Sequence, residues 1–223
     1  QISPPLPFVP GSEIAGVVRS APEGSGLAAG DRVCAFPGLG GFAEVVATEP
    51  SQVFPLPDNL TFAQGASVPM NVLTVHFALA HRGRLQAGET VLVHGAGGGI
   101  GIAAIQFSVA MGARVIAVAS TEEKRELALK AGASEAIAPE GFKDAAKELT
   151  GGRGVDIVVD PVGGDRFTDS IRALGQEGRI LVIGFTAGEI PTVKVNRLLL
   201  GNKSAVGVGW GEYWMTNPGY LAT

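Results

Sequence analysis

The sequence predicts an α/β fold in which a small β-rich domain precedes a doubly wound, parallel, six-stranded sheet. From residue 90 onwards, short apolar runs alternate with helical patterns, as in a series of β-α-β units. Residues 1–78 instead carry short strand patterns separated by Gly and Pro, which is typical of a small barrel or sandwich. The 223 residues are 46% hydrophobic, which suffices for one large or two small cores. We therefore expect domains at 1–78 and 79–223.

The first domain is expected to contain three short strands and the start of a helix. The strand patterns cover residues 11–18, 30–36 and 40–47, and each follows a glycine turn. Thr61 and Gln64 have the spacing of a capping box, which predicts a helix beginning there. A second helical pattern covers residues 71–80 and leads towards the larger domain.

Residues 90–111 form the centre of the larger domain: an apolar strand, a glycine turn and a helix. The spacing Ala96-x-Gly98-x-x-Gly101 fits the dinucleotide-binding fingerprint, with Ala in the first glycine position. This geometry points backbone N–H groups at a pyrophosphate. The alternative is a glycine-rich turn of the kind found in any α/β protein. The fingerprint predicts cofactor contacts at these residues: Ala96, Gly98, Gly99 and Ile100.

The rest of the chain supplies the other strands of the sheet. Strands are expected at residues 113–120, 135–139, 155–160, 178–184 and 204–210, and helices at 122–131, 142–149, 167–174 and 196–200. With the central strand this makes six strands alternating with helices, a Rossmann arrangement that binds ligands at the carboxyl ends of its strands.

The end of the second strand distinguishes NADP from NAD. Folds specific for NAD place a carboxylate there, but this strand ends in Ala119. Ser120 can hydrogen-bond a 2′-phosphate and Lys124 can neutralise it, so NADP(H) is the expected cofactor. The competing interpretation makes Glu122 the ribose-binding acid. Against it, Ser120-x-x-Glu123 reads as a capping box, and acids in a first helical turn favour the helix dipole.

Composition excludes several classes of function. The net charge is −4 and Lys and Arg form no run, which argues against a nucleic-acid or anionic-membrane partner. Cys34 is the only cysteine, so an internal disulfide is impossible, and a reducing cytoplasm is the expected location. Residues 90–113 carry no formal charge, but the glycine cluster in their middle favours a strand and helix over a membrane span.

Several motifs together resemble the medium-chain dehydrogenase/reductase superfamily: Pro10-Gly-Ser-Glu, Gly30-Asp-Arg-Val, Gly41-Phe-Ala-Glu, Val91-Leu-Val-His-Gly-Ala and Asp160-Pro-Val-Gly-Gly. They are most similar to the zinc-free NADPH:quinone oxidoreductases of the zeta-crystallin type. This resemblance implies a GroES-like catalytic domain, here partial, beside a Rossmann domain. It also implies contacts near the nicotinamide from these residues: Asn71, Thr74, Val162, Gly184 and Phe185. The chain resembles an internal portion that lacks both family termini, so we assign no catalytic residue.

The sequence predicts no metal site. Zinc-dependent relatives carry Gly-His-Glu where this chain has Gly11-Ser12-Glu13, and serine is a poor zinc ligand. A cysteine ligand of those relatives would align with Asn71. Without a metal to polarise a carbonyl, simple alcohol oxidation loses its electrophile, whereas hydride transfer to an electron-poor acceptor remains feasible.

The resemblance therefore implies an NADPH-dependent oxidoreductase that transfers hydride to a quinone or another conjugated carbonyl. One alternative is an enoyl-thioester reductase of the acryloyl-CoA type, and another is a non-enzymatic NADPH-binding protein. The expected partner is a small-molecule electron acceptor. The sixth strand is apolar and lies at a sheet edge, so a homodimer joined through it is also expected.

Overall fold

The computed structural model describes residues 4–217 and 219–222. The chain divides into two compact units, one comprising residues 1–73 and 211–223 and the other residues 74–210. Each unit is described by itself below. The division lies N-terminal to the predicted boundary at 78/79, and that boundary stays a prediction for the family's two domains.

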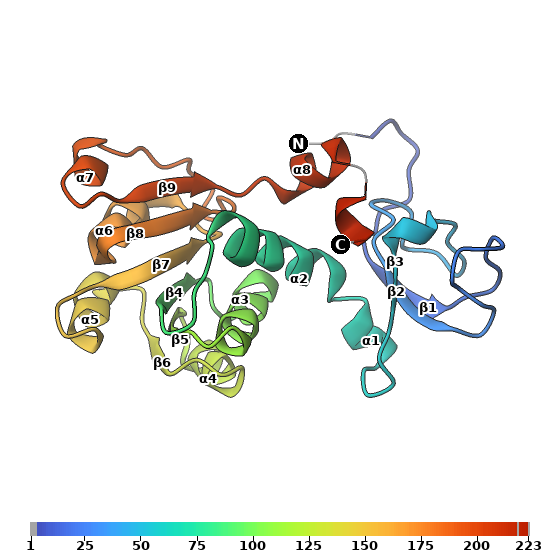
Figure 1. Ribbon diagram of the computed structural model, residues 1–223, viewed down its shortest axis with the longest axis horizontal. Helices are drawn as coiled ribbons and strands as arrows, with labels where there is room; N and C mark the ends of the chain where they lie inside the picture. Colours follow the sequence, from blue (N-terminus) through green and yellow to red (C-terminus); the bar gives the residue numbers. More distant parts are fainter. Residues whose placement is uncertain (1–3, 218, 223) are drawn as a thin grey trace. The chain divides into compact units, whose positions relative to one another are not determined.

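The larger unit contains a parallel six-stranded sheet, as expected. Its order is β6-β5-β4-β7-β8-β9, so the chain starts in the middle, builds one half outwards and then builds the other (Figure 1). The bounds are β4 Thr90–His94, β5 Arg114–Val118, β6 Glu135–Ile137, β7 Val155–Asp160, β8 Leu174–Val182 and β9 Ser204–Gly207. All five residues of β4 are buried, as befits a central strand covered on both faces. The strand order reverses between β4 and β7, and such a switch point is where these sheets bind ligands.

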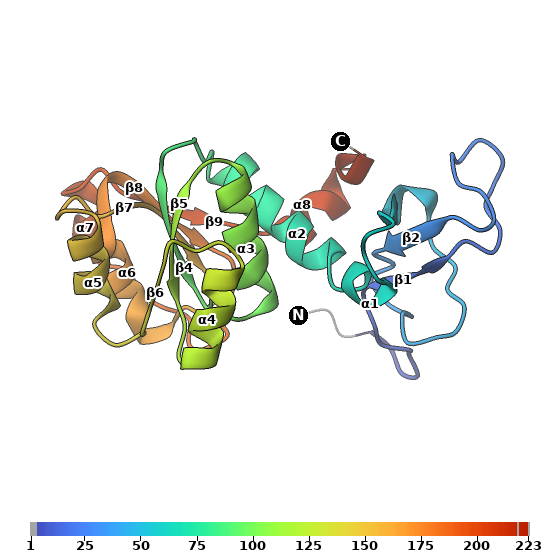
Figure 2. The same cartoon turned by 90° about the horizontal axis from the view of Figure 1, so that it is seen from below.

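Helices cover both faces of this sheet. Their bounds are α3 Gly99–Ala110, α4 Glu122–Lys130, α5 Phe142–Leu149, α6 Phe167–Ala173 and α7 Asn196–Leu199. Helices α3 and α4 lie on one face and α5 and α6 on the other (Figure 2). Leu92 of β4 and Val158 of β7 pack in one buried cluster with Phe142 and Ile171 of α5 and α6. These alternating strand residues fix which face of the sheet each helix covers.

Two differences from the expected elements bear on the site. Helix α3 begins at Gly99, not after the glycines, so Gly99 and Gly101 form its first turn. The N-cap of α4 is Thr121, whose hydroxyl accepts the Lys124 N–H at 3.3 Å. The capping box assigned to Ser120 is therefore wrong, because the chain enters the helix one residue later.

The smaller unit contains a three-stranded antiparallel sheet ordered β1 (Ile14–Val17), β2 (Arg32–Ala35), β3 (Val53–Pro55). The strand expected at residues 40–47 is wrong. Gly41 and Phe42 instead donate backbone hydrogen bonds to residues 11 and 10, at 2.8 and 2.9 Å, and the following residues form bends. The third strand is the unpredicted β3. Helix α1 (Phe62–Gly65) confirms the predicted capping box.

Helix α2 (Pro69–His76) continues directly into the π-helical segment η2 (Phe77–Arg82), which corresponds to the helix expected at 71–80. Pro69 opens this helix, as suits a residue without an N–H. The Glu13 carboxylate accepts the Met70 N–H at 2.7 Å and satisfies one of the free donors of the first turn. Helix α8 (Trp210–Thr216) lies near the C-terminal end.

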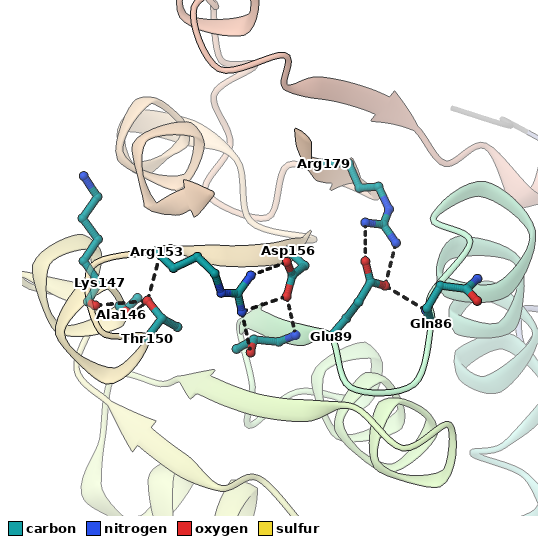
Figure 3. Close-up of polar contacts among 10 residues, drawn as sticks. Gln86, Glu89, Ala146, Lys147, Thr150, Arg153, Asp156 and Arg179 are labelled. Carbon is teal, nitrogen blue, oxygen red and sulfur yellow. Dashed lines mark hydrogen bonds and ion pairs between the residues drawn. The ribbon is translucent and has the colours of Figure 1, made fainter. Parts of the chain in front are cut away.

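Two ion pairs stabilise the parallel sheet near the amino ends of β4, β7 and β8, away from the carboxyl ends where the glycine turn lies. The Arg179 guanidinium donates to both carboxylate oxygens of Glu89, each at 2.8 Å (Figure 3). Arg153 likewise donates to both oxygens of Asp156, at 2.5 and 3.2 Å. Asp156 also accepts the backbone N–H of Thr90 at 2.7 Å. The Arg179–Glu89 pair thus ties β8 to the residue before β4, and Asp156 ties the start of β7 to that of β4, on the side away from the glycine turn.

Candidate functional site

A cavity of about 430 Å³ lies in the larger unit where β4, β5 and β7 end. Its lining combines the glycine turn with residues from the loops after β5, β6, β7 and β8. The lining residues are Gly95, Gly97, Gly98, Gly99, Ile100, Gly101, Val118, Ala119, Ser120, Lys124, Pro139, Pro161, Val162, Arg166 and Thr186. The cavity therefore lies at the switch point of the sheet, the position where parallel sheets bind nucleotides.

The glycine turn leaves helix donors available to a ligand. Gly98 is the N-cap of α3 and has no side chain to satisfy the first-turn N–H groups. A Cβ built on Gly98 would approach only the Gly95 carbonyl oxygen, at 3.4 Å, so the space beyond Gly98 is open. A Cβ on Gly101 would instead lie 2.3 Å from that same oxygen, so the helix packs too closely for any side chain there. Open donors beside an open approach suit a diphosphate.

Lys124 reaches the glycine turn from α4. A Cβ on Gly97 would lie 2.7 Å from both Cβ and Cγ of Lys124, so the lysine stem packs directly against this glycine. The side chain is exposed, and both it and Ser120 line the cavity. A hydroxyl and an ammonium group at the end of β5 form the donor set that a ribose 2′-phosphate needs.

The acid proposed for the competing NAD interpretation is already engaged. Glu122 pairs with Arg125 across 2.6 Å, and Arg125 also donates to the Ala119 carbonyl at 3.0 Å. Glu122 does not line the cavity. Ala119 is buried and brings no carboxylate to the strand end. The polar side chains of the cavity wall at the end of β5 are thus a hydroxyl and a cation, those of Ser120 and Lys124.

Asp160 shapes the loop after β7. Its Oδ1 accepts the N–H groups of Val162 and Gly163, both at 2.9 Å. Burial raises the pKa of the Asp160 carboxyl, while these two amides and the charge of Arg166 oppose that shift. The buried carboxylate therefore fixes the backbone of this loop and holds Val162 at the cavity wall.

His94 ends β4 directly before the glycine turn, and it is fully buried. Its Nε2 lies 2.8 Å from the Ser170 hydroxyl, which in turn donates to the Arg166 carbonyl oxygen at 3.1 Å. Burial, with a smaller effect from Arg166, lowers the pKa of His94 to about 3. The imidazole is therefore neutral at ordinary pH and links β4 to α6.

Six of the eleven predicted cofactor residues line the cavity, and the other five do not. Those that line the cavity are Gly98, Gly99, Ile100, Ser120, Lys124 and Val162. Ala96 is fully buried beneath the turn. Phe185 lies nearby, because a Cβ on Gly163 would meet its Cδ1 at 2.8 Å, and a Cβ on Gly184 would lie 3.3 Å from the Pro161 oxygen. Asn71 and Thr74 lie on α2, where Thr74 is buried and the Asn71 amide donates to the Ser67 carbonyl at 2.8 Å.

Sequence reasoning did not identify Pro139, Arg166 and Thr186 as cavity residues. Thr186 reaches the wall because its N–H donates to the Pro161 oxygen at 3.2 Å, which joins the loops after β7 and β8. Arg166 closes the short 3-10 turn η3 (Gly164–Arg166) before α6. None of the three belongs to a local motif, so only the strand order could have placed them together.

Within residues 4–217 and 219–222, no cluster of three or more His, Cys, Asp or Glu side chains could hold a metal ion. The same residues include no helix that is both long and apolar enough to cross a bilayer.

Family models match both parts of the chain. Residues 1–58 match the alcohol dehydrogenase GroES-like domain, and residues 99–223 match the zinc-binding dehydrogenase family. The chain belongs to the medium-chain dehydrogenase/reductase superfamily. The superfamily's two-part architecture accounts for a small antiparallel sheet followed by a Rossmann-type parallel sheet.

Within this superfamily the chain is similar to quinone oxidoreductases. It is 41% identical to quinone oxidoreductase-like protein 2 of Bos taurus, over 95% of this chain and 62% of that protein. It is 36% identical to the quinone oxidoreductase of Homo sapiens, over 81% of this chain and 56% of that protein. The chain thus spans about three-fifths of the length of these curated relatives.

Solved structures of superfamily members share the fold. A probable oxidoreductase from Mycobacterium abscessus is 51% identical, with a TM-score of 0.88 over 100% of this chain and 67% of that one. The Escherichia coli quinone oxidoreductase, solved in complex with NADPH, is 32% identical, with a TM-score of 0.84 over 95% of this chain and 67% of that one. The CurK enoyl reductase is 27% identical, with a TM-score of 0.84 over 96% of this chain and 65% of that one.

Proposed function

We propose that this protein is an NADPH-dependent oxidoreductase that transfers hydride to a quinone or another conjugated carbonyl. The observation that carries the proposal is the cavity at the switch point, which joins open helix donors to Ser120 and Lys124. Similarity to quinone oxidoreductases, one of them solved with NADPH, supports both the cofactor and the acceptor class. The bound nicotinamide would supply the hydride, as cofactors carry such chemistry.

Each part of the cavity has a distinct task in this proposal. The first-turn N–H groups of α3 hold the pyrophosphate, and Gly98 leaves room for its approach. Ser120 and Lys124 hold the 2′-phosphate by a hydrogen bond and by charge. Val162, Gly184 and Phe185 are proposed to contact the nicotinamide half from the loops after β7 and β8. Asn71 and Thr74 are proposed to lie near the nicotinamide as well.

Calorimetric titration of the purified protein with NADPH and NADH tests the cofactor assignment. We expect NADPH to bind more tightly, and Lys124→Gln to weaken NADPH by about tenfold while leaving NADH nearly unchanged, since only NADPH carries the 2′-phosphate. Lys130→Gln, a change of the same chemistry at the exposed end of α4, is the matched control. Equal affinity for the two nucleotides, or equal losses in the variant, would contradict the assignment.

We further infer that the reaction proceeds without zinc. Ser12 occupies the position at which zinc-dependent relatives carry histidine, and Asn71 aligns with a cysteine ligand. Cys34 is buried in β2, and burial raises the pKa of its thiol, which keeps it from the thiolate form that binds metals. Stoichiometric zinc in elemental analysis of the active protein would overturn this inference.

An enoyl-thioester reductase is the second candidate, and the similarity to the CurK enoyl reductase favours it. A non-enzymatic NADPH-binding role is the third. NADPH oxidation followed with a panel of quinones and with acryloyl-type acyl-CoAs separates the three: the leading proposal requires turnover with quinones and not with the thioesters. Binding of NADPH without turnover of either class would favour the non-enzymatic role.

We also propose a homodimer formed through β9. This strand lies at the edge of the sheet and is largely exposed. Val195, Leu199 and Leu200, which precede it, have 73%, 76% and 81% of their surface exposed. An unpaired edge beside exposed apolar side chains suits pairing with a second copy. Light scattering at micromolar concentration should give twice the chain mass, and a monomeric mass would refute the dimer.

The remaining partner assignments rest on composition. A net charge of −4 argues against nucleic acid, and the uncharged stretch at residues 90–113 forms a strand, turn and helix of the larger unit. We infer a cytoplasmic location, since the only cysteine is a buried residue of a sheet and suits a reducing compartment. Fluorescence microscopy of a tagged protein tests this location directly.

A further inference from the structure

The loop after β7 and the loop after β8 are joined to each other by backbone hydrogen bonds. The Ala187 N–H donates to the Val162 oxygen at 3.0 Å, and in the other direction the Gly164 N–H donates to the Glu189 oxygen at 3.2 Å. These bonds lie on either side of the turn that follows β7. The two loops therefore form one unit, and a displacement of the loop after β7 would move the loop after β8 with it.

The turn after β7 has a backbone conformation that glycine adopts readily and other residues do not. Gly163 has a φ of 66° with a ψ of −144°, and Gly164 has a φ of 69°. A Cβ on Gly163 would lie 2.8 Å from Cδ1 of Phe185, so this backbone packs directly against that ring. Two successive glycines leave the turn without side chains to hold it, so its shape depends on hydrogen bonds to its backbone.

Asp160 supplies those hydrogen bonds from the end of β7. Its Oδ1 accepts the N–H groups of Val162 and Gly163, both at 2.9 Å, and its side chain is buried. Its backbone oxygen accepts the N–H of Ile183, the residue directly after β8, at 3.0 Å. Within the part of the chain that the structure describes, Oδ2 has no partner. All the hydrogen bonds of this carboxylate therefore serve the turn after β7.

The contacts of Asp160 reach only one part of the nucleotide cavity. Val162 and Thr186 line the cavity from the joined loops, whereas Ser120 and Lys124 line it from the end of β5 and from α4. The glycine turn is shaped separately, by the close packing of α3 on β4. Loss of the Asp160 carboxylate should therefore disturb the wall formed by the loops after β7 and β8, and leave the phosphate-binding donors in place.

We propose that Asp160 is a positioning residue for the nicotinamide half of the cofactor, because its carboxylate fixes the joined loops that carry Val162, Gly184 and Phe185. This inference rests on the proposed function, since it assumes that the cavity holds a nicotinamide nucleotide. Asp160 itself touches neither the cofactor nor the acceptor. The rest of the nucleotide is held by the glycine turn and the end of β5, and its binding does not depend on Asp160.

Calorimetric titration of Asp160→Ala with NADPH and with AMP tests the proposal. Removal of the carboxylate frees two backbone N–H groups, and the loops then leave their binding shape for most of the time. A ligand that requires a state populated at about one part in ten binds about tenfold more weakly. We therefore expect NADPH to lose about tenfold in affinity, while AMP, which lacks the nicotinamide half, keeps the affinity that it has for the parent protein.

Asp156→Ala is the matched control. Asp156 lies near the start of the same strand and likewise accepts a backbone N–H, that of Thr90, but it does not line the cavity (Figure 3). This change should lower the Tm and leave both affinities of the folded protein unchanged. Asp160→Asn keeps an acceptor oxygen without the charge. Neutral acceptors form weaker hydrogen bonds, so its NADPH affinity should lie between those of the parent and Asp160→Ala.

The positioning role and the proposed function fail in distinguishable ways. If the parent protein binds neither NADPH nor AMP, the proposed function itself falls. If the parent binds both, the positioning role alone is overturned by equal losses of NADPH and AMP affinity, by parent-like NADPH affinity in either folded Asp160 variant, or by a selective loss of NADPH in Asp156→Ala. Circular dichroism identifies the folded variants, and Asp160→Asn decides the matter if Asp160→Ala is unfolded.

Discussion

Two glycines only three residues apart should respond to alanine in opposite ways. A methyl group on Gly98 would meet only the Gly95 oxygen at 3.4 Å, and its φ of −94° and ψ of 173° suit any residue. A methyl group on Gly101 would lie 2.3 Å from that oxygen and 2.6 Å from Ala96 Cα. Gly98→Ala should therefore affect the ligand, whereas Gly101→Ala should affect the fold.

The expected magnitudes follow from these contacts. At a contact as short as 2.3 Å, overpacking against backbone costs about 2–3 kcal/mol, and alanine recovers about 1 kcal/mol of helix propensity, so Gly101→Ala should lose about 1–2 kcal/mol of stability. In a domain of this size that corresponds to a Tm lower by about 2–8 °C. Gly98→Ala changes the N-cap of α3 from Gly to Ala, which should lower the stability of the fold by less than about 1.5 kcal/mol. Hydrogen bonds to a charged phosphate are worth about 1.5–3 kcal/mol, so its NADPH affinity should fall tenfold or more.

Thermal unfolding followed by circular dichroism, with calorimetric titration of NADPH, measures both effects. The reasoning requires Gly98→Ala to keep the parent Tm within about 3 °C while losing affinity. Parent-like affinity in Gly98→Ala would mean that no phosphate approaches this backbone. A parent-like Tm in Gly101→Ala would mean that the close approach of helix and strand is not required.

Three further changes test other parts of the fold. His94 has a pKa of about 3 against an ordinary value of 6.5, so between pH 6.5 and pH 3 the unfolded chain binds a proton that the folded chain does not. The free energy of unfolding should therefore fall by about 1.4 kcal/mol for each pH unit below 6.5, down to pH 3. Urea unfolding at several pH values from about 4.5 to 7 measures this, and the free energy of unfolding should depend less steeply on pH in His94→Gln. Arg179→Gln, which leaves Glu89 half-buried without its partner, should lose about 1–3 kcal/mol in urea unfolding at pH 7, and an unchanged midpoint would show that the pair contributes nothing. Thr61→Ala removes one half of the α1 capping box and should cost about 1 kcal/mol in the same assay, whereas the exposed neighbour Asp58→Ala should cost less.

The larger unit was more predictable than the smaller one for a physical reason. Strands such as β7 are largely buried, so the short apolar run at residues 157–159, directly before Asp160, identifies β7 without knowledge of its neighbours. The predicted strand at residues 40–47 has apolar residues as well, but it has no paired partner in the described unit. A strand exists only when its backbone groups find another strand, and a single segment of sequence does not contain that information.

The residues of the candidate site that lie close together in the sequence could be predicted, whereas those that only the tertiary structure brings together could not. The glycine turn, Ser120 and Lys124 follow one another along the consecutive elements β4, α3, β5 and α4, so local sequence patterns identify them together. Arg166 and Thr186 join them only because β7 lies beside β4, and because the loop after β8 bonds to the loop after β7. Sequence also placed the cap of α4 one residue early, since Ser120 and Thr121 are chemically equivalent caps.

The bidentate ion pairs of Arg179 and Arg153 have a consequence for how such a protein can change over generations. They secure one rim of the sheet, while the loops that meet the ligand occupy the opposite rim. Substitutions in the ligand rim can therefore accumulate without loosening the strands, and new acceptors become accessible to selection. A mutagenesis library confined to the loops after β5, β6, β7 and β8 should retain more folded members than one confined to the amino-end loops.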